Sequence, residues 1–439
     1  MRQISRTLSK DLKEHIGKEV TIAGWIHKKR MLGGLNFLNI RDRGGLVQVV
    51  VEDKKEVEKL RGMQIGTVVE IAGKVKSEER APGGAEIHEP TITVITPVTD
   101  EPPIEIDKPL DHKSENFDTL FGYRPVGLRN INETNIFKIQ ATILKACRDY
   151  FEKNDFTEAR TPKLLAEATE GGAEVFKLDY FGKEATLAQS PQFYKQILVG
   201  VFERVYEIAN VYRAEPSATV RHMTEYTSID GEMGFITLKD LEDFLSGMLN
   251  YIVDEVWKIH EQDLKKWNAT KPKLTEKFPV IPLQEIHELY FKATGEDSRG
   301  EKDMRPDEEK WITEYTKKKF GSEAMFVSDW PADDMKFYHQ ADPKNPDVAD
   351  RIDLIFRGVE ITTGSMREQD YKKVKTQLVA MGGDPEDPGF KPLLMAMQAG
   401  LPPHGGFGLG LERLTQKIIG LHNIKEASLF PRDINRLAP

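Results

Sequence analysis

The run from Arg204 to Phe235 constrains the fold most strongly, because it reads as two strands joined by a long, charged loop. Alternating aliphatic and aromatic residues favour a first strand ending at Arg213 and a second over 226–230. About a dozen residues lie between them, whereas hairpin loops usually have about two to five. The loop carries Arg213, Glu215, Arg221, His222 and Glu225. Planar guanidinium groups match polyphosphates well, so the hairpin is either a phosphate-binding loop or a solvated turn with scattered charge.

Length and composition restrict the class of protein to which the chain can belong. With 439 residues the chain exceeds one ordinary core, so at least two domains are expected. Hydrophobic residues make up 39% and charged residues 30%, as in soluble globular proteins. No apolar run is long enough for a transmembrane helix, and residues 1–18 lack the apolar segment of a secretory signal. The single cysteine, Cys147, excludes an intrachain disulfide and a cysteine-type zinc site. We therefore expect a cytoplasmic protein with no membrane contact.

Residues 1–100 predict a small all-β domain. Short alternating runs recur there, at 19–26, 37–40, 47–51, 68–72 and 92–95. Such strands with glycine-rich turns favour an OB-type barrel, whose surface can bind single-stranded nucleic acid. The net charge of −9 argues against a protein coated in nucleic acid, but Lys28, Lys29 and Arg30 form a local basic cluster here. We expect local RNA contact by this module.

The rest of the chain divides by composition and periodicity. Residues 101–130 are rich in proline and charge, which indicates a linker or hinge before a second domain over 131–439. Apolar residues at helical spacing predict a helix from Asn135 to Asn154. The chain has no GxxxxGK[ST] motif, which excludes a P-loop NTPase. Residues 236–350 show no pattern that predicts chemistry.

Three further motifs flank the charged hairpin, namely AQSPQFYK (188–195), GVEITTGSMR (358–367) and PHGGFGLGLER (403–413). Together with the hairpin they resemble the catalytic domain of class II aminoacyl-tRNA synthetases, and most of all the archaeal-type aspartyl-tRNA synthetases of class IIb. The resemblance spans nearly the whole chain. It implies an α+β catalytic domain, an antiparallel sheet flanked by helices, preceded by an OB-fold anticodon-binding barrel. Residues 156–162 resemble class II motif 1, which implies a homodimer, although the preceding helix could equally serve packing within one chain.

The resemblance implies ATP-dependent attachment of L-aspartate to tRNA through aspartyl-adenylate. Arg213 and Arg413 would be the catalytic residues. The implied amino-acid-binding residues are Glu170, Gln192, Lys195, Arg213, Asp230, Thr363 and Arg367. The implied ATP-binding residues are Arg213, Glu215, Arg221, His222, Met223, Glu360, Gly410, Leu411, Glu412 and Arg413. Mg²⁺ would be held by Asp353, Glu360 and Thr363, since magnesium prefers oxygen ligands.

Two cations explain the expected choice of amino acid. By resemblance Lys195 pairs with the side-chain carboxylate of aspartate, helped by Arg367. A neutral asparagine amide would leave both buried charges unpaired, at a cost of several kcal/mol.

The barrel residues bear on the choice of tRNA. By resemblance Phe37 stacks an anticodon base, while Arg30 and Gln48 hydrogen-bond base edges; Phe37 could instead be a core aromatic. His27 and Pro82 stand where discriminating archaeal enzymes carry tryptophan and lysine, and they resemble the non-discriminating subgroup that charges both tRNA-Asp and tRNA-Asn. Both substitutions could also be neutral variation of the barrel.

Other readings remain open. A discriminating aspartyl-tRNA synthetase differs only in its tRNA choice. An asparaginyl-tRNA synthetase is favoured by Ser365 and Met366, which depart from the aspartyl pattern, and disfavoured by Lys195. A synthetase-like asparagine synthetase is disfavoured by the N-terminal barrel, and a non-catalytic RNA-binding paralogue by the presence of Arg213 and Arg413.

Overall fold

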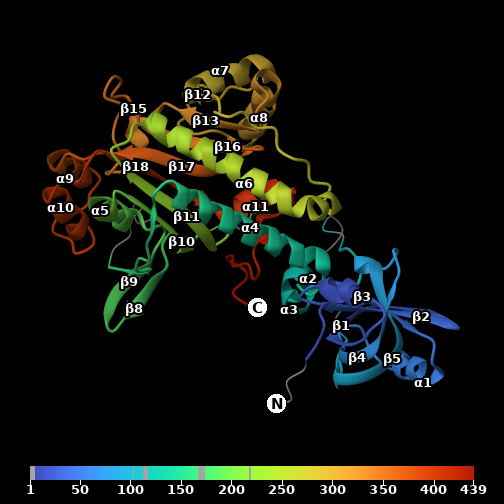
Figure 1. Ribbon diagram of the computed structural model, residues 1–439. Coiled ribbons are helices and arrows are strands. Elements are labelled where there is room, and N and C mark those ends of the chain that lie inside the picture. The colour runs from blue at the N-terminus through green and yellow to red at the C-terminus, as the bar shows by residue number, and fades with distance from the viewer. Residues whose placement is uncertain (1–4, 102, 111, 113–116, 167–173, 217–218) are drawn as a thin grey trace. The chain divides into compact units, whose positions relative to one another are not determined.

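The computed structural model (Figure 1) describes residues 5–101, 103–110, 112, 117–166, 174–216 and 219–439. The chain forms two compact units, residues 1–134 and residues 135–439. Among the described residues, no helix has the length and apolar character needed to span a membrane.

The first unit contains the expected OB-type barrel. Five strands close in the order β1-β2-β3-β5-β4, with bounds β1 Glu19–Leu32, β2 Leu35–Asp42, β3 Gly45–Val51, β4 Val68–Ser77 and β5 Ala85–Thr96. Burial alternates along β2, so Asn36, Leu38 and Ile40 point inward while Phe37 and its odd-numbered neighbours face outward. Short helices cover the barrel: η1 Ser9–His15, α1 Lys54–Arg61 and η2 Pro82–Gly84. The barrel prediction is confirmed.

The proline- and charge-rich segment contains two short helices, α2 Phe117–Gly122 and α3 Arg124–Gly127. A buried carboxylate anchors it: Glu133 accepts hydrogen bonds from Arg124 at 2.9 Å and contacts the His112 ring at 2.6 Å. Burial acts to raise the pKa of Glu133, but His112 and Arg124 together hold it below its ordinary value.

The second unit is built on an eight-stranded sheet of order β12-β13-β16-β17-β18-β11-β10-β6. The strands are β6 Thr157–Glu158, β10 Arg204–Tyr212, β11 Glu225–Gly234, β12 Val280–Pro282, β13 Ala324–Ser328, β16 Arg351–Phe356, β17 Val359–Arg367 and β18 His404–Gly410. Pairing is antiparallel except at the two edges, β12 with β13 and β6 with β10. The predicted antiparallel core and the predicted hairpin, β10–β11, are confirmed.

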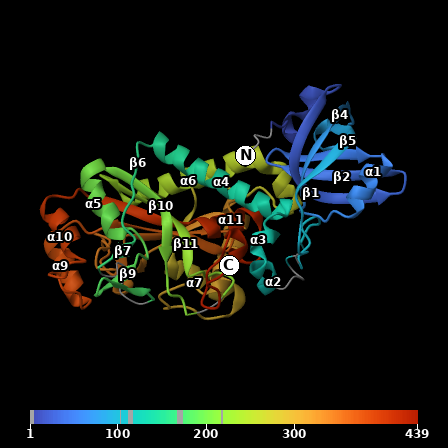
Figure 2. The same cartoon turned by 90° about the horizontal axis from the view of Figure 1, so that it is seen from below.

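Helices cover this sheet. The long helices α4 Ile131–Lys153 and α6 Leu238–Lys266 run across one face (Figures 1 and 2), and their apolar side chains form the main core with those of the central strands. The remaining helices are α5 Gln192–Phe202, α7 Leu283–Thr294, α8 Pro306–Phe320, α9 Tyr371–Ala380, α10 Lys391–Gln398, α11 Leu411–Ile419 and the short η3 Ala332–Asp334 and η4 Ile424–Ala427. Two small sheets, β7-β9-β8 and β14-β15, complete the unit, with bounds β7 Leu164–Leu165, β8 Lys177–Tyr180, β9 Lys183–Leu187, β14 Trp330–Pro331 and β15 Val348–Ala349.

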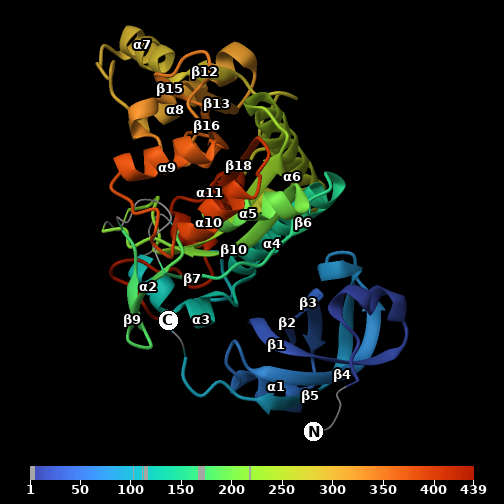
Figure 3. The same ribbon diagram turned by 90° about the vertical axis from the view of Figure 1, so that its left-hand side faces the viewer.

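The segment for which the sequence predicted no chemistry has a core of its own. Residues of β12, α7, α8 and β13, with Trp330 of β14 and Ile355 of β16, form this separate hydrophobic cluster, which includes Ile286 and Ile312. Within the second unit these elements gather at one end of the sheet (Figure 3).

Candidate active site

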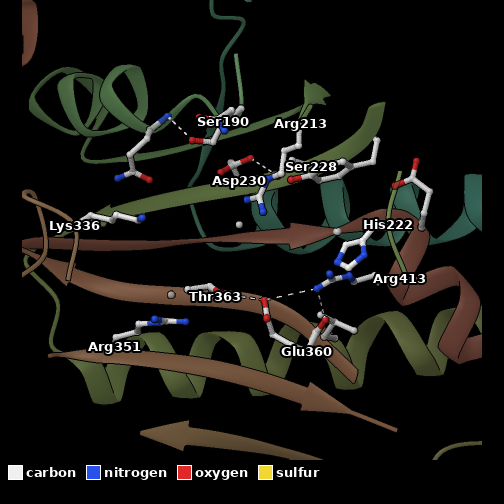
Figure 4. Close-up of a pocket in the computed structure, with 18 of the residues that line it drawn as sticks. Ser190, Arg213, His222, Ser228, Asp230, Lys336, Arg351, Glu360, Thr363 and Arg413 are labelled. Carbon is white, nitrogen blue, oxygen red and sulfur yellow. Dashed lines mark hydrogen bonds and ion pairs between the residues drawn. The ribbon is translucent and has the colours of Figure 1, made fainter. Parts of the chain in front are cut away.

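A cavity opens over the central strands β11, β17 and β18, next to the residues that follow β10 and the start of α5 (Figure 4). Most of the site residues expected from the sequence line it: Gln192, Lys195, Arg213, Glu215, Arg221, His222, Met223, Asp230, Glu360, Thr363, Arg367, Gly410, Glu412 and Arg413. Two others do not line it, because Leu411 packs in the core and Asp353 lies buried beside it. Glu170 lies outside the described residues.

The glycines of β18 make room for charged side chains on the neighbouring strand. Gly408 pairs with Asp230 and Gly406 with Glu232 in the β11–β18 register. A Cβ atom at Gly406 would lie 1.9 Å from a carboxylate oxygen of Glu232, so a larger residue there is incompatible with this geometry. The glycine-rich motif therefore makes room for two acids beneath the cavity.

Those acids neutralise the two cations expected to bind the substrate side chain. The Lys195 ammonium lies 3.0 Å from Asp230 Oδ1 and 3.5 Å from Glu232 Oε2, and donates to the Phe407 carbonyl at 2.9 Å. Arg367 donates to both carboxylate oxygens of Glu232, at 2.7 and 3.2 Å. All four charged side chains are at most 5% exposed. Burial acts to raise the pKa of Glu232, but Arg367 and Lys195 hold it below its ordinary value.

Glu232 was missed by the sequence reasoning. A signal for it existed, because residues two apart on a strand share a face and Asp230 had already been placed in the site. Ser365, which departs from the aspartyl pattern, accepts a hydrogen bond from Arg367, so this departure keeps a contact to the predicted substrate-binding arginine. Met366 is buried and packs beside Gly405.

The predicted metal ligands meet at the other end of the cavity. Asp353 and Thr363 are cross-strand partners, and the Thr363 hydroxyl donates to Glu360 at 3.0 Å. Arg351 donates to Asp353 at 2.7 Å and stacks over the Trp330 ring, with its guanidinium carbon 4.2 Å from the ring centroid. Burial raises the pKa of Asp353 to about 7 despite Arg351.

These oxygen donors fit magnesium, which typically takes one or two carboxylates together with substrate phosphates. No group of three or more histidine, cysteine, aspartate or glutamate side chains that could hold a metal ion occurs among the residues that the structure describes. Because Arg351 already binds Asp353, Glu360 and Thr363 are the more available ligands.

The end of the cavity that holds the predicted metal ligands is also lined by residues of the loop between β10 and β11 and of the first turn of α11. Arg413 donates to the Glu360 carbonyl at 2.9 Å. The His222 ring contacts the Thr219 hydroxyl at 2.7 Å, and Arg221 donates to Glu309 on α8 at 2.8 Å. Glu412 lines the cavity, but its carboxylate accepts the backbone N–H of Thr227, so it braces the hairpin.

Three of the barrel residues expected to contact the anticodon, Arg30, Phe37 and Gln48, share the outer face. Arg30 is exposed and lies directly across from Phe37, which is half-buried. The Gln48 amide on the next strand donates to Glu86 at 2.8 Å. His27 sits at a β-bulge and is only 9% exposed, while Pro82 begins η2.

Comparison with known proteins agrees with this architecture. Residues 116–434 match the family described as tRNA synthetases class II (D, K and N), and residues 20–95 match the OB-fold nucleic acid binding domain. The chain is 40% identical over 99% of its length to the whole of the Aspartate--tRNA(Asp/Asn) ligase of Thermus thermophilus. It is 38% identical over 96% of its length to 97% of the Aspartate--tRNA(Asp) ligase of Pyrococcus abyssi.

A solved structure shares the complete fold. The asparaginyl-tRNA synthetase from Pyrococcus horikoshii complexed with asparaginyl-adenylate superposes with a TM-score of 0.92 at 32% identity, and all of each chain is covered. The fold and the site thus define a class II aminoacyl-tRNA synthetase. The chain belongs to the aspartate, lysine and asparagine family of these enzymes, which use ATP and bind tRNA.

Proposed function

We propose that this enzyme activates L-aspartate with ATP and Mg²⁺ and transfers it to both tRNA-Asp and tRNA-Asn, as a cytoplasmic homodimer. The observation that carries the choice of aspartate is the buried quartet of Lys195, Asp230, Glu232 and Arg367. The names of the Thermus thermophilus and Deinococcus radiodurans relatives, both Aspartate--tRNA(Asp/Asn) ligase, support the same assignment.

The quartet suggests how aspartate is selected. It carries two positive and two negative charges, so the pocket side chains are neutral as a group before substrate binds. When the substrate ammonium pairs with Asp230, Lys195 loses a partner and becomes free for the side-chain carboxylate. The neutral amide of asparagine could not replace that lost charge, so Lys195 would keep only the more distant Glu232 carboxylate, and an incompletely paired buried ammonium costs free energy.

Activation joins the two ends of the cavity. The α-carboxylate attacks the α-phosphorus of ATP, which forms aspartyl-adenylate and releases pyrophosphate. Arg213, whose guanidinium carbon lies 5.9 Å from the centroid of the Tyr226 ring, would bridge the reacting carboxylate and phosphate. Mg²⁺ bound at Glu360 and Thr363 would offset the negative charge of the phosphates. Positioning and charge stabilisation dominate such chemistry, so no side-chain base is required.

In the second step a terminal-adenosine hydroxyl of tRNA attacks the mixed anhydride. Choice of tRNA depends on the barrel, where His27 and Pro82 replace the bulkier indole and the lysine of discriminating enzymes. We expect His27→Trp combined with Pro82→Lys to reduce aspartylation of tRNA-Asn more than that of tRNA-Asp. Equal reduction for both tRNAs would leave these two residues without a role in the choice.

An asparaginyl-tRNA synthetase remains the second candidate, because its fold is shared and Ser365 and Met366 resemble that group. ATP–pyrophosphate exchange with each amino acid separates the two. We expect exchange with aspartate only, and loss of that exchange in a folded Arg213→Ala variant. Arg61→Ala, on the exposed surface of α1, should behave as wild type. Near-normal exchange in Arg213→Ala would refute the assigned role of this arginine, and exchange with asparagine alone would favour the second candidate.

A further inference from the structure

Helix α8 reaches the triphosphate end of the cavity although it lies in the segment for which the sequence predicted no chemistry. Glu309, in its first turn, accepts a hydrogen bond from Arg221 Nη1 at 2.8 Å. The two side chains are 14% and 24% exposed. Arg221 lines the cavity and Glu309 does not, so the carboxylate lies behind the guanidinium as seen from the cavity.

Contacts of the buried Glu308 side chain hold the first turn of α8 in place. Glu308, next to Glu309, is fully buried and contacts the His287 ring at 2.8 Å and the Ser298 hydroxyl at 2.5 Å. The other oxygen of Glu308 accepts the backbone N–H of Arg305 at 2.9 Å, which caps the helix. These contacts hold the backbone from which Glu309 projects.

The same helix packs on the turn that leads into the metal-binding strand. The Thr313 hydroxyl accepts the backbone N–H of Gly358 at 3.0 Å. Gly358 has φ of +77°, and a Cβ there would lie 3.2 Å from Lys310 Cα, so only glycine suits this close approach. Glu360 follows two residues later, which ties the position of α8 to the phosphate end of the cavity.

Glu309 lies near the cations Arg221 and Arg413 and near the like-charged Glu360. Burial, together with the neighbouring Arg221, lowers the pKa of Lys417 to about 8. Burial raises the pKa of Glu309, while Arg221 and Arg413 act in the opposite direction. A guanidinium has five N–H donors, and the contact with Glu309 uses one nitrogen, so donors of Arg221 are left to face a phosphate.

We propose that Glu309 is a positioning residue for ATP, which holds the Arg221 guanidinium in the orientation that binds the triphosphate. This inference depends on the proposed function only in that Arg221 contacts the nucleotide. Glu309 itself does not touch the substrate. It links the segment 236–350 to the chemistry of the reaction through one ion pair.

Removing the Glu309 charge has two opposite consequences, and their balance tests the proposal. A carboxylate near bound phosphates repels them, so its loss alone would strengthen ATP binding. Loss of orientation frees a long side chain to move away from its binding position, which weakens ATP binding. The proposal requires that the second effect exceeds the first.

The experiment measures the Kd of ATP·Mg²⁺ by calorimetry on the full chain without amino acid, and the KM values for ATP and aspartate in pyrophosphate exchange. For Glu309→Gln we expect ATP affinity to fall by about tenfold, as for a lost positioning contact, with the KM for aspartate within about twofold of wild type. Glu309→Asp keeps the charge and should recover part of the affinity. Glu314→Gln, exposed on the same helix, is the matched control and should bind ATP as wild type does.

A double-mutant cycle shows whether the effect passes through Arg221. The Glu309→Gln change should cost little further ATP affinity in an Arg221→Ala background. Unchanged or tighter ATP binding in Glu309→Gln, or equal rises in both KM values, would overturn the proposal. Because the Kd needs no amino acid, absence of aspartate-dependent exchange in wild type would refute the proposed function without deciding the role of Glu309.

Discussion

The catalytic cavity and the outer face of the barrel hold their polar groups in different ways. In the cavity, Lys195 and Glu232 are buried and each charge contacts an opposite one. On the barrel, Arg30 is exposed and Phe37 is half-buried on an open strand surface. The cavity must stabilise charge in a reaction, which needs fixed groups away from water. The barrel surface needs only exposed side chains that can contact nucleic-acid bases.

This difference predicts whether a mutation changes both stability and function or only one contact. A buried network loses stability and function together when one member is removed, because its partner is left charged and unpaired. An exposed side chain on a strand loses only its own contact. Substitutions in the two regions should therefore differ in both size and reach.

The largest effect is expected at Glu232. Glu232→Gln removes the carboxylate shared by Lys195 and Arg367, and breaking a buried ion pair in this way costs about 3–5 kcal/mol. We expect kcat/KM for aspartate in pyrophosphate exchange to fall by about a hundredfold or more, with a smaller change in the KM for ATP. The comparison would fail if the KM for aspartate stayed at its wild-type value.

Mutation of a second buried glutamate, Glu207, distinguishes an effect on stability from an effect on substrate binding. Glu207, on the adjacent strand β10, is also buried and bonds to Thr161 and Lys163 outside the cavity. We expect Glu207→Gln to lower the thermal midpoint while leaving the KM for aspartate unchanged.

A smaller effect is expected on the barrel. Stacking of one base on an aromatic ring contributes about 1–3 kcal/mol, so Phe37→Ala should raise the KM for tRNA-Asp about tenfold. Pyrophosphate exchange needs no anticodon contact and should not change. Ile95→Ala, at an exposed position on β5, provides the control. A fall in pyrophosphate exchange would show that the barrel mutation is not local.

An effect on stability alone, with no change expected in substrate binding, is a pH dependence at Glu412. Burial raises the pKa of Glu412 from 4.5 to about 7, so the folded state binds its proton more tightly than the unfolded chain. The stability from this group is complete below about pH 4.5 and is lost as pH rises to about 7. At roughly 1.4 kcal/mol per pKa unit, the loss is about 3 kcal/mol.

Glu412→Gln removes this titration and keeps an oxygen that can accept the Thr227 N–H. We expect its thermal midpoint, relative to wild type, to rise by several degrees between pH 5 and pH 8. A difference that does not change with pH would show that the Glu412 carboxyl titrates at its ordinary value.

Local patterns predicted several elements, while the catalytic sheet was implied by the family resemblance. Alternating strands gave the barrel, the hairpin within Arg204–Phe235 was placed correctly, and the helix predicted from Asn135 to Asn154 corresponds to α4. These features depend on neighbours in sequence, where periodicity and turn residues carry the information. The cavity brings together most of the residues expected there because their motifs lie on adjacent strands.

Contacts between distant segments were not predictable in this way. Arg367 and Glu232 are separated by 135 positions, and Arg221 and Glu309 by 88. Arg351 binds Asp353 two residues away, yet no pattern in the sequence distinguishes that pair from two independent side chains. Partners of this kind are set by how the sheet and α8 pack, which a single sequence does not reveal.

Aspartylation of purified tRNA-Asp and tRNA-Asn, with aspartate and asparagine tested separately, examines the central claim most directly. The charge balance of the Lys195 pocket and the residues at 27 and 82 together predict aspartate, and no asparagine, on both tRNAs. Aspartate on tRNA-Asp alone would contradict the role given to His27 and Pro82. Asparagine on tRNA-Asn would contradict the account of the buried quartet.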